Sequence, residues 1–187
     1  ESLGDFLYRD ANGDGRLDTS DRVEIGHGTL PRLTFGANIG LSWNNFDFSM
    51  LFQGVGNHQV YYNNQAFRFV TVMGQSLIKD ITDNAWTLDN PYDSKYPILR
   101  NSSNSQNNIA SDAFIHNAAY LRCKNIQLGY TVPSDISRRF FVENLKIYGS
   151  IDNLFTITKF PGLDPEIGAT VGYPAIRQYS VGINVSF

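Results

Sequence analysis

The residues best spaced for chemistry lie near the start of the chain, in the stretch DANGDGRLDTSD. Side chains that carry oxygen stand at alternate positions, and a glycine follows at the place where an EF-hand loop turns sharply. Later carboxylates stand at the ninth and twelfth positions of such a loop. The spacing predicts a structural Ca²⁺ site with the ligands Asp10, Asn12, Asp14, the carbonyl of Arg16, Asp18 and Asp21.

Two features of this stretch favour a simpler interpretation. Its last ligand position is Asp21, which reaches less far than the usual bidentate glutamate, and no amphipathic helix flanks the loop. A polar loop built from Asx turns would need no ion. Both interpretations stay open, and a bound ion would have the structural role of stiffening the loop.

The remaining reactive side chains do not predict an enzyme. His27, His58 and His116 are far apart in sequence, and no serine or cysteine stands in a nucleophile elbow. Asp164 and Glu166 give only a weak hint of a glycoside hydrolase, and a turn is their expected role. The net charge is −3 without a basic block, which argues against nucleic acid as a partner. We therefore expect no catalytic residues.

The elements that must position these residues are β-strands. Apolar and polar side chains alternate from Leu33 to Asn44, and again from Phe46 to Gln53 after an Asn-Asn turn. Three further alternating runs cover residues 125–132, 145–152 and 179–187, and a bulge is expected at 153–155. This pattern predicts an all-β, antiparallel fold with one apolar and one polar face.

Short and long connections alternate between these strands. Residues 1–32, 56–118 and 157–175 are long loops, whereas the turns at 44–45 and 133–143 are short, as in transmembrane barrels. An open sheet edge in lipid leaves backbone groups unpaired, so five strands predict a segment of a larger transmembrane β-barrel. The alternative is a soluble, secreted, calcium-stabilised β-sandwich that binds carbohydrate.

Several strings in the sequence resemble one known family. They are FQGVGN (52–57), AWTLDNP (85–91) followed by KYPIL (95–99), AYLRCKNIQLGYTVP (119–133), DNLFTITKFPGLDPE (152–166) and YPAIRQYSVGINVSF (173–187). Together they resemble the C-terminal part of SusC/RagA-type TonB-dependent outer-membrane transporters. The resemblance implies about the last five strands of a 22-stranded barrel in the bacterial outer membrane, crossing it several times.

The same resemblance implies a function and partners. It implies import of oligosaccharides, or of peptides, through a barrel that works with a SusD-like surface lipoprotein. The inner-membrane TonB complex would drive import by pulling on an N-terminal plug that precedes Glu1. Membrane lipid would contact the apolar face, and no organic cofactor is implied.

Orientation follows if the last strand ends in the periplasm. Residues 133–143 then form a periplasmic turn, and residues 1–32, with the predicted calcium loop, lie outside the cell with the loops 56–118 and 157–175. Loop aromatics could contact substrate or lipoprotein, or pack in the loop's own core; they are Tyr61, Tyr62, Phe67, Phe69, Trp86 and Tyr92. Tyr179 and Phe187 resemble the signal read by outer-membrane assembly machinery. Cys123 is expected on the polar face of its strand.

Overall fold

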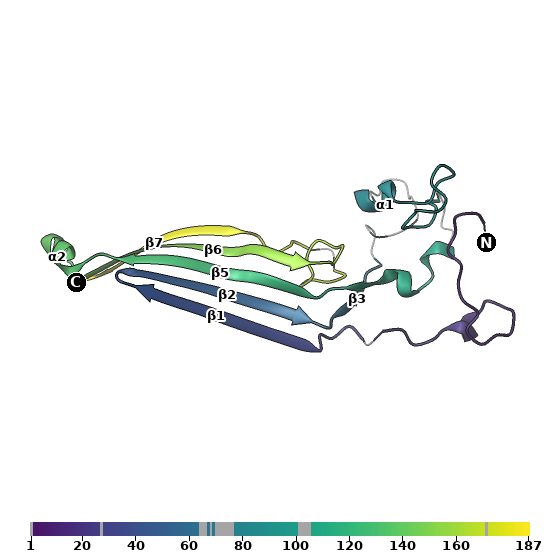
Figure 1. Ribbon diagram of the computed structural model, residues 1–187, viewed down its shortest axis with the longest axis horizontal. Coiled ribbons are helices and arrows are strands. Elements are labelled where there is room, and N and C mark those ends of the chain that lie inside the picture. Colours follow the sequence, from purple (N-terminus) through teal and green to yellow (C-terminus); the bar gives the residue numbers. More distant parts are fainter. Residues whose placement is uncertain are drawn as a thin grey trace. The chain divides into compact units, whose positions relative to one another are not determined.

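A computed structural model describes residues 2–26, 28–63, 67, 69, 77–100, 106–170 and 172–187. Its main feature is one antiparallel sheet of five long strands in the order β1-β2-β5-β6-β7 (Figure 1). These strands are β1 (Leu33–Trp43), β2 (Phe46–Gly56), β5 (Tyr120–Thr131), β6 (Asn144–Thr158) and β7 (Gln178–Ser186). Each long strand pairs with the next one along the chain, which confirms the predicted antiparallel segment.

The strand register separates two kinds of side chain. One cross-strand row contains Trp43, Phe46, Tyr130, Ile147 and Ile183. The next row contains Ser42, Asp47, Gly129, Tyr148 and Gly182. Directly paired residues point to the same side of a sheet, so the first row belongs to an apolar face and the second to a polar face.

The apolar face is open. The side chains of Trp43 and Val181 are 74% and 85% exposed. A soluble sandwich would cover such a face with a second sheet packed against it. In the described part of the chain the sheet is single, apart from a two-stranded ribbon, which favours the barrel segment over the sandwich.

A β-bulge interrupts the alternation of β5. Phe52 pairs with Cys123 and Leu51 pairs with Asn125, so Lys124 is the extra residue. In β5, each residue that precedes the bulge lies on the face opposite to the one predicted by counting back from the residues that follow it. Cys123 therefore lies on the apolar face beside Phe52, and our expectation of the polar face was wrong. The predicted irregularity in β6 is confirmed opposite this bulge, with Asn153 at a φ of +51°.

The rest of the described chain forms a second compact unit. Residues 1–28 and 60–116 group together, and residues 29–59 and 117–187 form the unit that holds the sheet. Short elements occur here: a 3-10 turn at Thr19–Asp21, β3 (Gln59–Tyr61), α1 (Lys79–Asp83), 3-10 turns at Gln106–Asn108 and Asp112–Phe114, and β4 (Ile115–Asn117). Its core contains Tyr62, Phe67, Phe69, Ile81 and Phe114.

Two remaining helical turns connect β5 to β6. They are α2 (Ser134–Ser137) and a 3-10 turn at Arg138–Phe140. Among the residues with assigned positions, no helix is long and apolar enough to cross a membrane.

Candidate functional site

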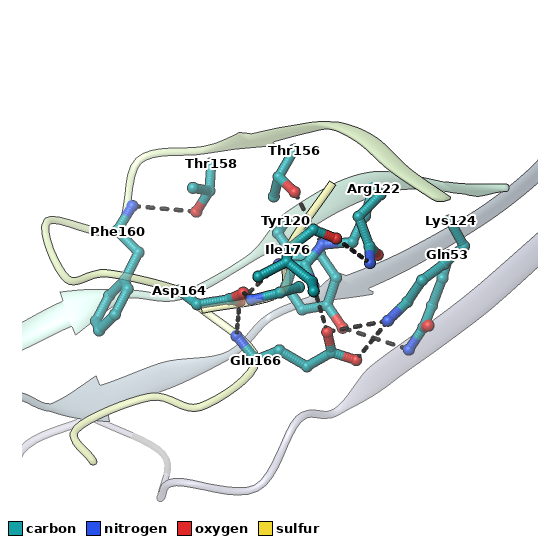
Figure 2. A network of polar contacts seen from close by, with 12 residues as sticks. Gln53, Tyr120, Arg122, Lys124, Thr156, Thr158, Phe160, Asp164, Glu166 and Ile176 are labelled. Atoms are coloured by element: carbon teal, nitrogen blue, oxygen red, sulfur yellow. Dashed lines mark hydrogen bonds and ion pairs between the residues drawn. The ribbon is translucent and has the colours of Figure 1, made fainter. Parts of the chain in front are cut away.

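The most highly organised polar group in the sheet unit surrounds Arg122 on the polar face of β5 (Figure 2). Arg122 is only 2% exposed, yet each of its three guanidinium nitrogens has a partner. Nη2 donates to Asp164 Oδ1 at 2.6 Å, and Nη1 donates to Glu166 Oε2 at 2.5 Å. Nε donates to Thr156 Oγ1 on β6 at 2.8 Å. A buried guanidinium with this many partners is held in one geometry.

Asp164 joins the loop of residues 159–177 to this arginine. Its Oδ1 also accepts the backbone N–H of Glu166 at 2.9 Å, and its Oδ2 accepts that of Ala175 at 2.9 Å. The carbonyl of Asp164 accepts the N–H of Gly168 at 3.2 Å. One buried aspartate therefore fixes both the start and the end of the loop.

The pKa of Asp164 reflects these partners. Burial by itself would raise the pKa of the carboxyl group, because it disfavours the charged form. The N–H groups of Ala175 and Glu166, with the Arg122 guanidinium, outweigh burial and hold the pKa below its usual value. Asp164 is consequently an anion wherever the loop is folded onto the sheet at neutral pH.

A more exposed ion pair borders the buried one. Lys124 Nζ lies 2.9 Å and 3.0 Å from the two carboxylate oxygens of Glu166. The side chains of Lys124 and Glu166 are 26% and 35% exposed, so water screens this pair. Two cations and two anions thus balance, and we call Arg122, Lys124, Asp164 and Glu166 the ion cluster.

Neighbouring side chains complete the support of the ion cluster. The guanidinium carbon of Arg122 lies 5.5 Å from the centre of the Tyr120 ring, and the Tyr120 hydroxyl accepts from Gln53 Nε2 at 3.3 Å. Thr158 Oγ1 accepts the N–H of Phe160, where the loop leaves β6, and donates to the carbonyl of Ala119. Strands β2, β5 and β6 all contribute to holding the loop.

This arrangement is suited to anchoring and not to catalysis. A general acid of a glycoside hydrolase needs a raised pKa, whereas the pKa of Asp164 is lowered. Both carboxylates of the ion cluster already accept hydrogen bonds from cations. The chemistry available to the cluster is to bind the loop 159–177 to the polar face.

Sequence reasoning missed the ion cluster, although a signal was present. The two cations are two residues apart on β5, and the two anions are two residues apart in the loop. Matching charge spacings in a strand and in a later loop suggest direct pairing. We had interpreted the aspartate and the glutamate as a turn only.

The predicted calcium loop is closed by its own backbone. Asp10 accepts the N–H groups of Gly13 at 2.6 Å and Gly15 at 2.7 Å, and Asp14 accepts that of Arg16 at 2.8 Å. Asp21 accepts the N–H groups of Ala11 and Asp18 at 2.9 Å and 2.8 Å. The Asp18 N–H is the main cause that lowers the pKa of Asp21.

The contact of Asp14 with the Arg16 N–H spans two residues, as in an Asx turn, and the contacts of Asp10 and Asp21 close the loop over longer spacings. Over the described residues, no three His, Cys, Asp or Glu side chains gather closely enough to hold an ion. Asp10, Asp14, Asp18 and Asp21 therefore do not form a ready site in this conformation. A Ca²⁺ ion at this loop stays a prediction, which a binding measurement has to test.

The loop aromatics lie in different environments. Tyr62 is 3% exposed, and its ring centre lies 5.3 Å from that of Phe67 in the core of the loop unit. Tyr61 is 39% exposed, and Trp86 is half-buried against Gly4. Tyr92 is 95% exposed, and its side chain is the most exposed of these loop aromatics.

The two residues of the predicted assembly signal lie at opposite ends of β7. Tyr179 pairs with Ile151 on the apolar face and is 67% exposed. Phe187 follows the last residue of the strand and is 89% exposed. Their role in assembly stays a prediction.

Comparison with known proteins connects this geometry to a family. No protein-family model matches the chain. Over 98% of its length, the chain is 30% identical to TonB-dependent receptor P3 of Formosa agariphila, of which it covers 19%. It is 28% identical over 97% of its length to the TonB-dependent receptor SusC of Bacteroides thetaiotaomicron, of which it covers 17%.

Solved structures give the same result. The chain superposes on a structure of the RagAB peptide importer in the closed-closed state with a TM-score of 0.75 and 29% identity. That match covers 95% of this chain and 20% of the solved chain. For the open-open state of the same importer the TM-score is 0.71. The chain thus spans about a fifth of the length of the first relatives and solved chains that it matches.

Proposed function

The chain belongs to the TonB-dependent receptors as a barrel segment of the SusC/RagA type, and from this premise we propose that it forms part of the wall of an outer-membrane importer. The observation that carries the proposal is the pair of sheet faces. An apolar face that stays exposed suits contact with lipid hydrocarbon. The opposite face carries polar residues and glycines, which suit a lumen that contains water.

The proposed cargo is an oligosaccharide or a peptide. Peptide is supported by the similarity to RagAB, which is described as a peptide importer. Oligosaccharide follows from the sequence resemblance described above. We further propose a SusD-like surface lipoprotein as partner and the TonB complex as the source of energy, on the strength of the similarity to SusC and RagA.

Within this importer, the ion cluster has a structural task. The loop 159–177 lies on the polar face, and a loop on that face narrows the lumen. Because Arg122 and Asp164 are both almost fully buried, the loop is fixed to the wall at this point. The cluster therefore helps to define the width of the lumen at one end of the strands.

Nutrient uptake by the native host tests the proposal. The gene for the full-length receptor is deleted and then restored on a plasmid, and growth is measured on peptides or on oligosaccharides as limiting nutrients. We expect one nutrient class to require the receptor, and we expect a surface lipoprotein to copurify with it. Growth that is independent of the receptor on both classes, or a receptor absent from outer-membrane fractions, would overturn the proposal.

A further inference from the structure

The turn that connects β5 to β6 has an unusual backbone. Phe141 has a φ of +58°, in the left-handed region that favours glycine. Its N–H donates to the carbonyl of Arg138 at 3.1 Å, and the N–H of Val142 donates to that of Ser137 at 3.3 Å. This pair of bonds is the Schellman motif that ends helices, and glycine is the usual residue at the position of Phe141.

A phenylalanine at this position is unfavourable in two ways. Left-handed backbone strains a residue with a side chain, and the ring of Phe141 is 92% exposed to water. Phe140 beside it is 70% exposed. A glycine would remove the strain and one exposed ring without changing the hydrogen bonds of the turn. The fold therefore does not explain the ring, and an external contact would.

The turn is firmly attached to the sheet. Glu143 N–H donates to the carbonyl of Ser186 at 2.8 Å, and Val132 N–H donates to that of Leu145 at 2.8 Å. Ser137, the last residue of α2, is 1% exposed. The two phenylalanines are thus presented from a fixed base.

Two arginines precede the exposed rings. Arg138 and Arg139 are both exposed, and no ion pair involves them among the residues that the structure describes. The turn also contains two acidic residues. Asp135 lies in the first turn of α2, and Glu143 borders a hollow on the polar face with Pro133 and Ser134. Neither the arginines nor the phenylalanines border that hollow.

The position of the turn along the strands indicates a partner. Trp43, Phe46 and Tyr130 form an aromatic row on the apolar face at this end of the sheet, with 4.7 Å between the ring centres of Phe46 and Tyr130. Aromatic rows of this kind mark the edge of the hydrocarbon in membrane barrels. The turn begins only a few residues beyond Tyr130. In a barrel embedded in the membrane, this position corresponds to the level of the lipid headgroups.

We propose that this turn is a binding site for anionic phospholipid, with Arg138 and Arg139 on the phosphate and the rings of Phe140 and Phe141 among the upper acyl carbons. The proposal rests on the proposed outer-membrane location. Guanidinium groups match the phosphate geometrically, and exposed rings lose their unfavourable contact with water. The strain at Phe141 is then offset when the receptor is embedded in the membrane.

Lipid titration of the full-length receptor tests the site. The receptor is purified in detergent and titrated with phosphatidylglycerol, or with phosphatidylcholine for comparison, and bound lipid is counted by native mass spectrometry. We expect the double variant Arg138→Gln/Arg139→Gln to bind phosphatidylglycerol roughly 30-fold more weakly, as expected for two arginines near an anionic surface. The matched control Arg9→Gln/Arg22→Gln removes equal charge from exposed positions in the other unit, and it should bind as the wild type does.

A second variant separates lipid binding from folding. Phe141→Gly should raise the melting temperature in detergent, because glycine accepts the positive φ, and should still weaken phosphatidylglycerol binding. A purely structural role would change stability alone. Unchanged phosphatidylglycerol affinity in both variants would overturn the site. So would an arginine variant that loses binding to peptidoglycan fragments while its phosphatidylglycerol affinity is unchanged. Wild-type nutrient uptake alongside unchanged lipid affinity would refute the lipid site only, whereas a receptor absent from the outer membrane would refute the proposed function.

Discussion

Replacing Asp164 by Asn in the full-length receptor should release the loop 159–177 from the sheet. The change removes the charge that faces Arg122 while the size of the side chain is kept. Arg122 and Asp164 are 2% and 3% exposed, so water cannot replace the lost partner without opening the loop. Breaking a buried ion pair from one side costs about 3–5 kcal/mol.

The structure places the expected cost at the lower end of that range. Glu166 and Thr156 still accept from the Arg122 guanidinium in the variant, at 2.5 Å and 2.8 Å in the native chain. We therefore expect a loss of about 3 kcal/mol, which raises the equilibrium constant for local opening roughly 150-fold.

Lys124→Gln is the matched control, because it removes one charge from the same ion cluster at a screened position. The Lys124 and Glu166 side chains are 26% and 35% exposed, and such pairs contribute about 0.2–1 kcal/mol. The control should raise the opening constant by no more than about fivefold. The contrast between the two variants isolates burial as the cause.

Hydrogen exchange at the amide of Gly168 measures the opening. This N–H donates to the backbone carbonyl of Asp164 at 3.2 Å, a bond that neither substitution removes. Its protection therefore reports loop opening and not the loss of a side-chain acceptor. Equal loss of protection in Asp164→Asn and Lys124→Gln, or no loss in either, would refute the reasoning.

Three further outcomes follow from the same structure. The hydrogen-bond donors to Asp164 lower its pKa despite burial. Its contribution to loop stability is therefore present at pH values above the ordinary aspartate pKa, and it is lost as the pH falls through the lowered pKa. Loss of Gly168 protection near neutral pH would contradict this. Deletion of Phe187 should reduce the amount of assembled receptor, and unchanged levels in outer-membrane fractions would refute the assembly signal. Calorimetry on the intact receptor should detect Ca²⁺ binding that Asp14→Ala abolishes, and no binding heat would leave the opening loop with its Asx turns alone.

Alternation of side chains was enough to predict the sheet. The run from Leu33 to Asn44 is unbroken, and β1 covers Leu33–Trp43 with each residue on the expected face. The face of a residue depends only on counting by two from its neighbours, as long as no residue is inserted. The faces of β7 were predicted equally well, because no bulge interrupts that strand.

The second unit could not be predicted in the same way. Its core rests on side chains distant in sequence, such as Phe6 and Phe69, whose ring centres lie 5.3 Å apart at an interplanar angle of 88°. Asp5 likewise pairs with Arg100 at 2.8 Å, and this contact is the main cause that lowers its pKa. No local periodicity encodes such contacts, so we treated residues 1–32 and 56–118 as separate loops.

The bulge at Lys124 explains why the ion cluster was missed and why it exists. Counting back by two from Gln127 through Asn125 puts Cys123 on the polar face and Arg122 on the apolar face, where a charged residue is costly in lipid. One extra residue reverses both assignments, so Arg122 pairs with Gln53 on the polar face and Cys123 lies beside Phe52. The bulge thereby moves a guanidinium from the apolar face, which the proposed function places against lipid, to a position where Asp164 and Glu166 can neutralise it. The strand irregularity and the anchored loop are consequently one feature of the molecule.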